Sequence, residues 1–117
     1  MTMSPGEIAT AFSGHRFGEV YPHLARDVRW ILVGGPVLEG APAVVDACEA
    51  TLAGLSTVTT DVTRFLVIAG DHGVAVDVVA DYTGPDGAAS RVASCDLYVF
   101  TDGLISEITS YTVELPT

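Results

Sequence analysis

The first part of the chain carries apolar residues at the spacing of helices. A helix is predicted to start at Ser4-Pro5-Gly6-Glu7, where serine is the N-cap, proline stands in the first turn and glutamate completes a capping box. Ser13-Gly14 is predicted to end it. A second helix is predicted over residues 17–25, although Pro22 makes it short or broken. A third is predicted over residues 41–52, with a proline in its first turn.

The pattern then changes to that of β-sheet. A short strand is predicted before the third helix, over residues 28–33, and residues 37–40 are expected to be a connector. Segments rich in valine and threonine predict further strands over residues 56–69, 74–83, 90–101 and 104–115. The last two are joined by Asp102-Gly103, the strongest short hairpin signal. This order predicts an α+β fold, with a strongly curved antiparallel sheet wrapped around about three N-terminal helices in one domain, residues 1–117.

Composition narrows the function more than the fold. Fifteen acidic residues against five basic ones give a formal net charge of −10, which argues against binding nucleic acid or an anionic membrane. No metal or nucleotide motif is present, so no cofactor is expected. Cys48 and Cys95 lack CxxC spacing and are expected to be free, buried thiols of a protein in the reducing cytoplasm. The N-terminus lacks a signal-peptide pattern, and no apolar run approaches the roughly 18 residues of a membrane span.

Asp96 is the strongest candidate for a functional residue. It stands in a strand among apolar and aromatic residues, where a charged group is unusual. Alternation along the strand divides it into two faces. One face carries Val92, Ser94, Asp96, Tyr98 and Phe100, and the other carries Ala93, Cys95, Leu97 and Val99. We expect the first face to lie inside, and the uniformly apolar second face (Cys95, Leu97, Val99) to form a homodimer interface.

Asp77 is the second candidate for chemistry. If Gly84 pairs with Gly87, Asp77 falls on the same face as Asp96 and is its diagonal neighbour, whereas a slip of one residue would turn Asp77 outward. Two carboxylates in one apolar pocket cannot both ionise cheaply, so one would hold a proton near neutral pH. Such a pair suits acid/base catalysis.

Three segments carry a resemblance to a known family. They are residues 24–30 (Leu-Ala-Arg-Asp-Val-Arg-Trp), residues 38–40 (Leu-Glu-Gly) before a helix, and residues 95–105 followed by Ser110-Tyr111. In their order and spacing, over almost the full length, the chain resembles the nuclear-transport-factor-2-like (NTF2-like) superfamily and its small SnoaL-like, polyketide-cyclase-like domains. The resemblance implies a cone-shaped sheet with an internal pocket, and often a dimer.

The resemblance also implies and excludes particular chemistries. Asp96 lines up with the oxyanion-hole aspartate of ketosteroid isomerases of this fold, but Leu32 stands where those enzymes have their base. Their first-helix tyrosine has no counterpart among the inward residues Ile8, Ala9, Ala11 and Phe12. The Arg-x-Asp pair of limonene-epoxide-hydrolase relatives is not matched around Asp77, and neither is their second aspartate, near Ser110. The polyketide-cyclase subgroup uses a single pocket aspartate, a part that Asp96 or Asp77 could play.

Three hypotheses follow. The chain binds a small apolar or cyclic metabolite and acts as a cofactor-independent isomerase, cyclase or hydrolase with Asp96 and Asp77, or it is a non-catalytic ligand-binding or dimerisation module. The third is an interaction subunit that binds a protein partner through the apolar face of Cys95, Leu97 and Val99. The expected ligand-binding residues are Phe12, His23, Trp30, Leu32, Ser94, Tyr98 and Ser110. For each of them a structural role is the alternative: Trp30 as core, His23 as a surface or capping residue, and Asp96 as a hydrogen-bonded carboxylate that holds the fold. His15 and His72 are expected to be solvated in turns.

Overall fold

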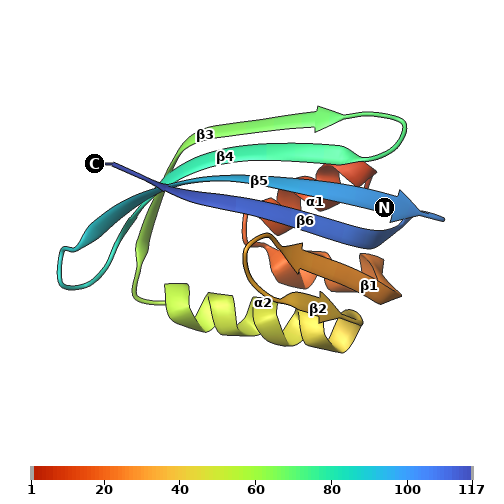
Figure 1. Cartoon of the computed structure of the whole chain (residues 1–117), viewed down its shortest axis with the longest axis horizontal. Coiled ribbons are helices and arrows are strands. Elements are labelled where there is room, and N and C mark those ends of the chain that lie inside the picture. The colour runs from red at the N-terminus through yellow and green to blue at the C-terminus, as the bar shows by residue number, and fades with distance from the viewer. Residues whose placement is uncertain (1, 117) are drawn as a thin grey trace.

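The computed structural model describes residues 2–116, which form one six-stranded sheet with helices on one side (Figure 1). The elements in chain order are α1 (Pro5–Ser13), the 3₁₀ helices η1 (Phe17–Glu19) and η2 (Tyr21–His23), β1 (Leu24–Leu32), β2 (Val37–Glu39), α2 (Ala41–Leu55), β3 (Thr59–Ala69), β4 (Val74–Thr83), β5 (Ala89–Thr101) and β6 (Leu104–Leu115). The strand order is β2-β1-β6-β5-β4-β3. All pairs are antiparallel except β1 with β6, which are parallel.

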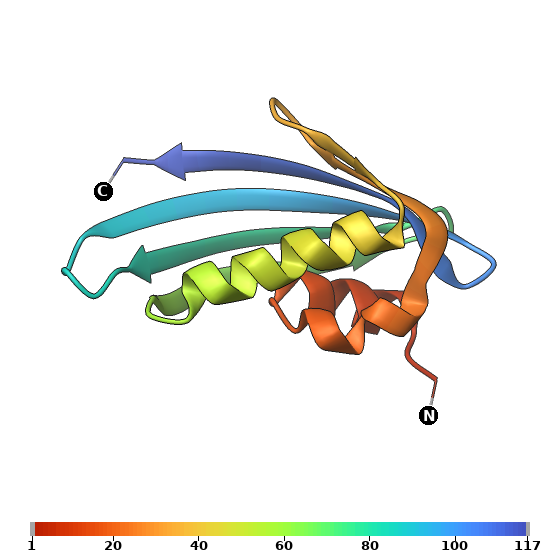
Figure 2. The same cartoon turned by 90° about the horizontal axis from the view of Figure 1, so that it is seen from below.

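The long strands β3 to β6 bend over the helices, which lie against the concave face (Figure 2). The convex face of these strands carries no other element in either view. The predicted α+β plan with a curved sheet is therefore confirmed. The prediction of three helices is wrong, because residues 17–25 form η1, η2 and the start of β1. Pro22 lacks a backbone N–H and stands in the first turn of η2, where a continuous helix would lose a hydrogen bond.

Local signals placed the first helix and the last hairpin correctly. Ser4 and Glu7 form the predicted capping box, with hydrogen bonds of 2.9 and 3.1 Å. Asp102 and Gly103 have φ values of 53° and 80°, the left-handed pair that a tight hairpin turn needs. Other boundaries differ: β1 starts at Leu24, residues 37–39 form the short strand β2, α2 continues to Leu55, and β3 starts at Thr59.

The core lies between α1 and the middle of the sheet. Phe12 of α1 makes edge-on contacts with Phe17, Trp30 and Tyr98, at ring-centroid distances of 4.9, 5.1 and 5.9 Å. Such aromatic contacts add stability beyond the burial of their area. Phe12 thereby ties α1 to two strands that are distant in sequence, β1 and β5.

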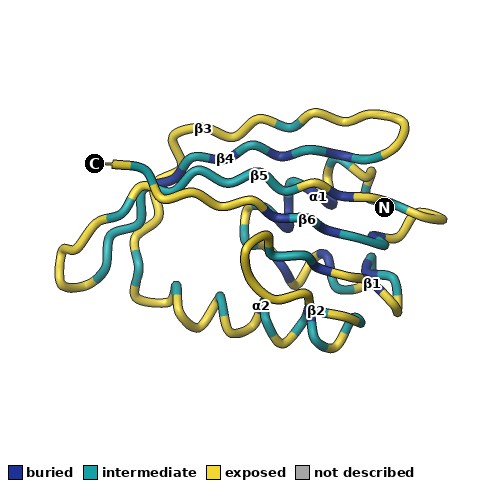
Figure 3. Tube along the Cα trace, in the orientation of Figure 1, coloured by how far each residue is buried: buried dark blue, intermediate teal, exposed yellow. Residues whose placement is uncertain are grey.

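The longer helix α2 is less completely packed than α1. Val44 and Cys48 are its fully buried residues, and it packs mainly against β1 and β2. Towards its C-terminal end, Leu52 is 38% exposed. Edge strand β3 is exposed along almost its whole length (Figure 3). The concave face therefore stays open between the end of α2 and the strands β3 and β4.

Both cysteines are free, as predicted, and Cys48 is buried whereas Cys95 is only partly so. Burial raises the pKa of the Cys48 thiol to about 12, so it behaves as an inert core residue. Among the residues that the structure describes, no helix is both long enough and apolar enough to cross a membrane.

Candidate functional site

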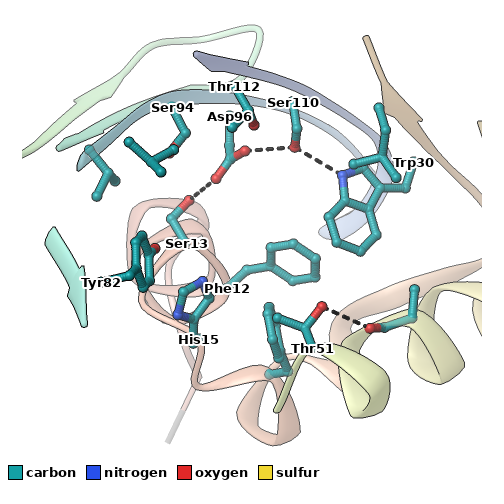
Figure 4. A pocket seen from close by; sticks show the side chains of 15 residues that line it. Phe12, Ser13, His15, Trp30, Thr51, Tyr82, Ser94, Asp96, Ser110 and Thr112 are labelled. Carbon is teal, nitrogen blue, oxygen red and sulfur yellow. Dashed lines mark hydrogen bonds between the residues drawn. The ribbon is translucent and has the colours of Figure 1, made fainter. Parts of the chain in front are cut away.

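The concave face of the sheet carries an open cavity of about 290 Å³ between β1, β4, β5, β6, the end of α1 and the middle of α2 (Figure 4). Its walls are mostly apolar or aromatic. Its lining residues are Phe12, Ser13, His15, Phe17, Trp30, Leu32, Ala47, Thr51, Val78, Tyr82, Val92, Ser94, Asp96, Ser110 and Thr112. Asp96 supplies the one carboxylate among them.

Strand register directs Asp96 into this cavity. Asp96 pairs with Val76 of β4 and Ser110 of β6, both of which are buried on the concave side. Ser13 Oγ at the end of α1 donates to Asp96 Oδ2 at 2.7 Å, and Ser110 Oγ donates to Asp96 Oδ1 at 2.6 Å. Hence both carboxylate oxygens accept a hydroxyl hydrogen bond.

Each hydroxyl is itself oriented by a further donor. Trp30 Nε1 donates to Ser110 Oγ at 2.9 Å. Ser13 Oγ lies 2.5 Å from Tyr98 Oη, and because Ser13 gives its single proton to Asp96, Tyr98 must be the donor to Ser13. Burial and the nearby Asp96 charge raise the pKa of Tyr98 well above its usual value, which keeps its proton in place. Two relays of donors thus converge on Asp96, a pattern that fits an acceptor-only carboxylate.

The predicted pairing of Asp77 with Asp96 is wrong. Asp77 lies opposite Cys95, on the convex face, where Arg64 Nε binds its Oδ2 at 2.8 Å. The cause is the turn after β4: Thr83 pairs with Ala89, so the register differs by one residue from a Gly84–Gly87 pairing. Because side chains alternate, that single residue moves Asp77 to the other side of the sheet. Because Asp77 and Asp96 lie on opposite faces of the sheet, the hypothesis that the two carboxylates share a proton is wrong as well.

Most of the other predicted ligand-binding residues do reach the cavity. Phe12, Trp30, Leu32, Ser94 and Ser110 line it. Tyr98 is 1% exposed and acts on the cavity through Ser13 rather than lining it.

The expected position of His23 at the pocket rim is not realised. His23 ends η2 and is not among the residues that line the cavity. The expectation assumed one continuous helix over residues 17–25. The structure has the short 3₁₀ helices η1 and η2 instead, so the backbone follows a different path at His23.

His15 is the main residue that the sequence reasoning missed. It was expected in a solvated turn, yet it is half-buried and lines the cavity with a φ of 63°. Histidine is among the few residues enriched at positive φ, and strained backbone of this kind gathers at functional sites. Burial lowers the pKa of the His15 imidazole, although the charge of Asp96 opposes this shift. The ring is therefore neutral at pH 7 and can accept or donate one proton.

Ser13 and Tyr82 were also missed. Ser13 appeared only as a helix-ending residue, and no sequence signal links it to Asp96 across 83 positions. Tyr82 could have been found by alternation once the register of β4 was known, since Ala80 and Tyr82 share the concave face. Burial, with the Asp96 charge as a second cause, raises the pKa of Tyr82, so it stays a hydroxyl donor.

The cavity brings together side chains of the types that acid/base chemistry uses. A carboxylate, a neutral imidazole and a tyrosine hydroxyl face one small cavity with apolar walls. In residues 2–116, no group of three or more histidine, cysteine, aspartate or glutamate side chains could hold a metal ion.

Comparison with known sequences gives a family match. The model of the SnoaL-like domain matches residues 7–108. No curated protein sequence matches the chain.

Comparison with solved structures gives the same fold over nearly the full length. An NTF2-like protein of unknown function from Cytophaga hutchinsonii has a TM-score of 0.79 and 27% identity, and the alignment covers 91% of this chain and 93% of that one. A candidate polyketide cyclase from Xanthomonas campestris has a TM-score of 0.70 and 20% identity, with 92% of each chain covered. An epoxide hydrolase similar to limonene epoxide hydrolase, from M. tuberculosis, has a TM-score of 0.65 and 17% identity, with 88% and 74% covered. The resemblance seen in the sequence is thereby confirmed.

Proposed function

Because the chain belongs to the SnoaL-like domain family, we propose that it binds a small, mostly apolar organic molecule and performs cofactor-independent acid/base chemistry on it. The reaction class is that of an isomerase, cyclase or hydrolase. The single observation that carries the proposal is Asp96, a lone carboxylate in an apolar cavity with a hydroxyl donor on each oxygen.

The roles follow from the contacts. Asp96 is the general base, because Ser13 and Ser110 hold its carboxylate in one orientation while each oxygen keeps a further lone pair for the substrate. Tyr82, with its raised pKa, is a hydrogen-bond donor to a developing oxyanion. His15, neutral at pH 7, carries a proton between two positions on the ligand.

The size of the cavity limits the ligand. Its volume of about 290 Å³ lies at the lower end of the usual range of ligand pockets, roughly 300–1,000 Å³. The group that meets Asp96 is therefore a small ring or carbonyl compound rather than a large polycycle. Structures with this fold include a candidate polyketide cyclase and an epoxide hydrolase, and at 17–20% identity they support the fold and not one of these reactions.

A non-catalytic ligand-binding or dimerisation module is the second candidate. The full hydrogen bonding of Asp96 is also what a structural carboxylate would show. The convex face favours a homodimer in either case, because large apolar side chains are exposed on it. These are Leu66, Ile68, Leu97, Val99, Tyr111 and Val113. In this dimer, the partner would contact Cys95, Leu97 and Val99. We also propose that this single-domain protein is cytoplasmic, because both of its cysteines are free thiols, as is usual in a reducing compartment.

A substrate-independent test of the base uses nitrobenzisoxazole, a small neutral carbon acid. A base removes the ring C–H proton, the electron pair left behind forms the nitrile, and the N–O bond breaks to release a coloured phenolate. We expect the wild type to accelerate this elimination and Asp96→Asn to lower kcat/KM at least a hundredfold. Asp77→Asn is the matched control, since it removes a carboxylate from the neighbouring strand on the convex face, and it should stay within about twofold of the wild type.

Thermal melting of each variant shows that it is folded. Full activity in folded Asp96→Asn would exclude Asp96 as the base. A wild type that binds the probe without accelerating its elimination would favour the non-catalytic module.

A further inference from the structure

A second hollow, of about 330 Å³, continues the concave face beyond His15. It lies between the end of α1, the last turns of α2 and the strands β3 and β4. It shares Ser13, His15, Val78 and Tyr82 with the cavity around Asp96. These four residues are a junction with one space on each side, so a ligand in the first space can extend into the second.

The second hollow differs in chemistry from the first. Its remaining lining residues are Gly14, Leu52, Leu55, Ser56, Thr60, Val62 and Ala80. None of them is acidic or basic, in a chain with a formal net charge of −10. Leu52 is 38% exposed and Val62 is 48% exposed, although both lie on the concave side, where apolar residues would ordinarily be covered.

The cause of this exposure is the course of α2. That helix packs on β1 and β2 and buries Val44 and Cys48, whereas it makes few contacts with β3. The gap leaves apolar surface on both walls, Leu52 and Leu55 from the helix and Val62 from the strand. Apolar walls without charge attract an apolar ligand segment, and burial of each methylene is favourable.

We propose that the second hollow binds an unbranched apolar arm of the same ligand whose reacting group meets Asp96. The substrate class is then an elongated molecule with a small polar ring or carbonyl head and an alkyl or acyl arm. His15 and Tyr82 hold the junction between head and arm. The assignment of the head to Asp96 rests on the proposed function, whereas the arm site rests on the continuity of the two spaces.

The probes for this proposal are para-alkylphenols from methyl to hexyl, with dissociation constants measured by isothermal titration calorimetry. For the wild type we expect binding to tighten roughly fourfold for each added methylene until the hollow is filled. Val62→Glu places a charge in the hollow and should abolish that gain while leaving the affinity for para-cresol unchanged. Leu52→Glu, on the opposite wall, should do the same.

Val33→Glu is the matched control, because Val33 is also about half-exposed, at 49%, and lies outside both spaces. It should keep the wild-type dependence on chain length. A wild-type affinity that does not depend on chain length would overturn the proposal, and so would a gain that persists in both Val62→Glu and Leu52→Glu.

A second copy of the chain is the competing occupant of the hollow. If Val62→Glu converts a dimer into a monomer in sedimentation velocity, the hollow is an interface between copies and the proposal is wrong. The experiment tests the arm site separately from the proposed role of Asp96 as a base. Asp96→Asn should keep the dependence of affinity on chain length, whether or not the wild type is catalytically active.

Discussion

At the scale of single residues, the orientation of one carboxylate depends on side chains from four elements. Ser13 comes from α1, Trp30 from β1, Tyr98 from β5 and Ser110 from β6. The sequence identified Asp96, because a charge in an apolar strand is conspicuous, together with five residues that line its cavity. It could not identify Ser13 or His15, since nothing local distinguishes a serine at a helix end, or a histidine in a turn, that faces a cavity from one that faces water.

His15 gives a pH prediction at this scale. Its folded-state pKa is lowered by burial, so the unfolded chain takes up the proton first as the pH falls. The contribution of His15 to stability is therefore present above its unfolded pKa of about 6.5 and is lost as the pH falls through that value towards the lower folded pKa. His15→Asn removes this titration and keeps a side chain that tolerates the left-handed backbone.

The measurement is urea unfolding at pH 7.5 and pH 5.5. We expect the free energy of unfolding to fall more between these pH values in the wild type than in His15→Asn. Equal losses in the two proteins would show that His15 is not held in its neutral form.

At the scale of elements, patterns contained within a few residues were predictable and pairings between strands were not. The capping box of α1 and the Asp102-Gly103 turn depend on neighbouring residues, and both are where the sequence placed them. The register of β4 on β5 depends on how many residues the turn after Thr83 takes up, and one residue there decided the position of Asp77. Pro22 predicted that the second helix would be short or broken, but it did not predict that β1 begins at Leu24.

Gly73, in the turn between β3 and β4, gives a stability prediction at this scale. A Cβ atom at this position would come within 2.2 Å of the backbone carbonyl oxygen of Tyr98, which cannot move without disturbing β5. Gly73→Ala should therefore lower the free energy of unfolding by about 1–3 kcal/mol, as overpacking does.

Gly70→Ala in the same turn is the control. Its added methyl would meet nothing closer than 3.9 Å, so its stability in urea should stay close to that of the wild type. Similar stabilities of the two variants would mean that the turn adapts to the added methyl group.

At the scale of the whole molecule, the sheet separates two surfaces of different character. The concave face holds the helices and both hollows, and the convex face exposes the six large apolar residues named above. The sequence placed Cys95, Leu97 and Val99 on the convex face from alternation alone. It could not show how far α2 stands from β3, because that distance depends on the packing of a helix on strands that precede it in the chain.

The dimer prediction belongs to this scale. Leu97→Lys puts a charge in the middle of the convex face, so we expect it to be a monomer in sedimentation velocity, whereas the wild type has the mass of two chains. Val33→Glu should remain a dimer, because the altered residue lies in the turn between β1 and β2. A wild type that is monomeric at every concentration would contradict the proposed interface.

The parallel pairing of β1 with β6 has a consequence for the timing of folding. β1 is the first strand of the chain and β6 the last, and Trp30 and Ser110 bond across 80 positions. Contacts between distant segments form slowly, because a long loop must close before they contribute stability. During synthesis the edge of β1 that pairs with β6 stays unpaired until residue 110 has emerged. The cavity around Asp96, which Ser110 and Thr112 of β6 help to line, is therefore assembled in the last step. A chain truncated before β6 would lack this cavity and would expose an unpaired, aggregation-prone strand edge.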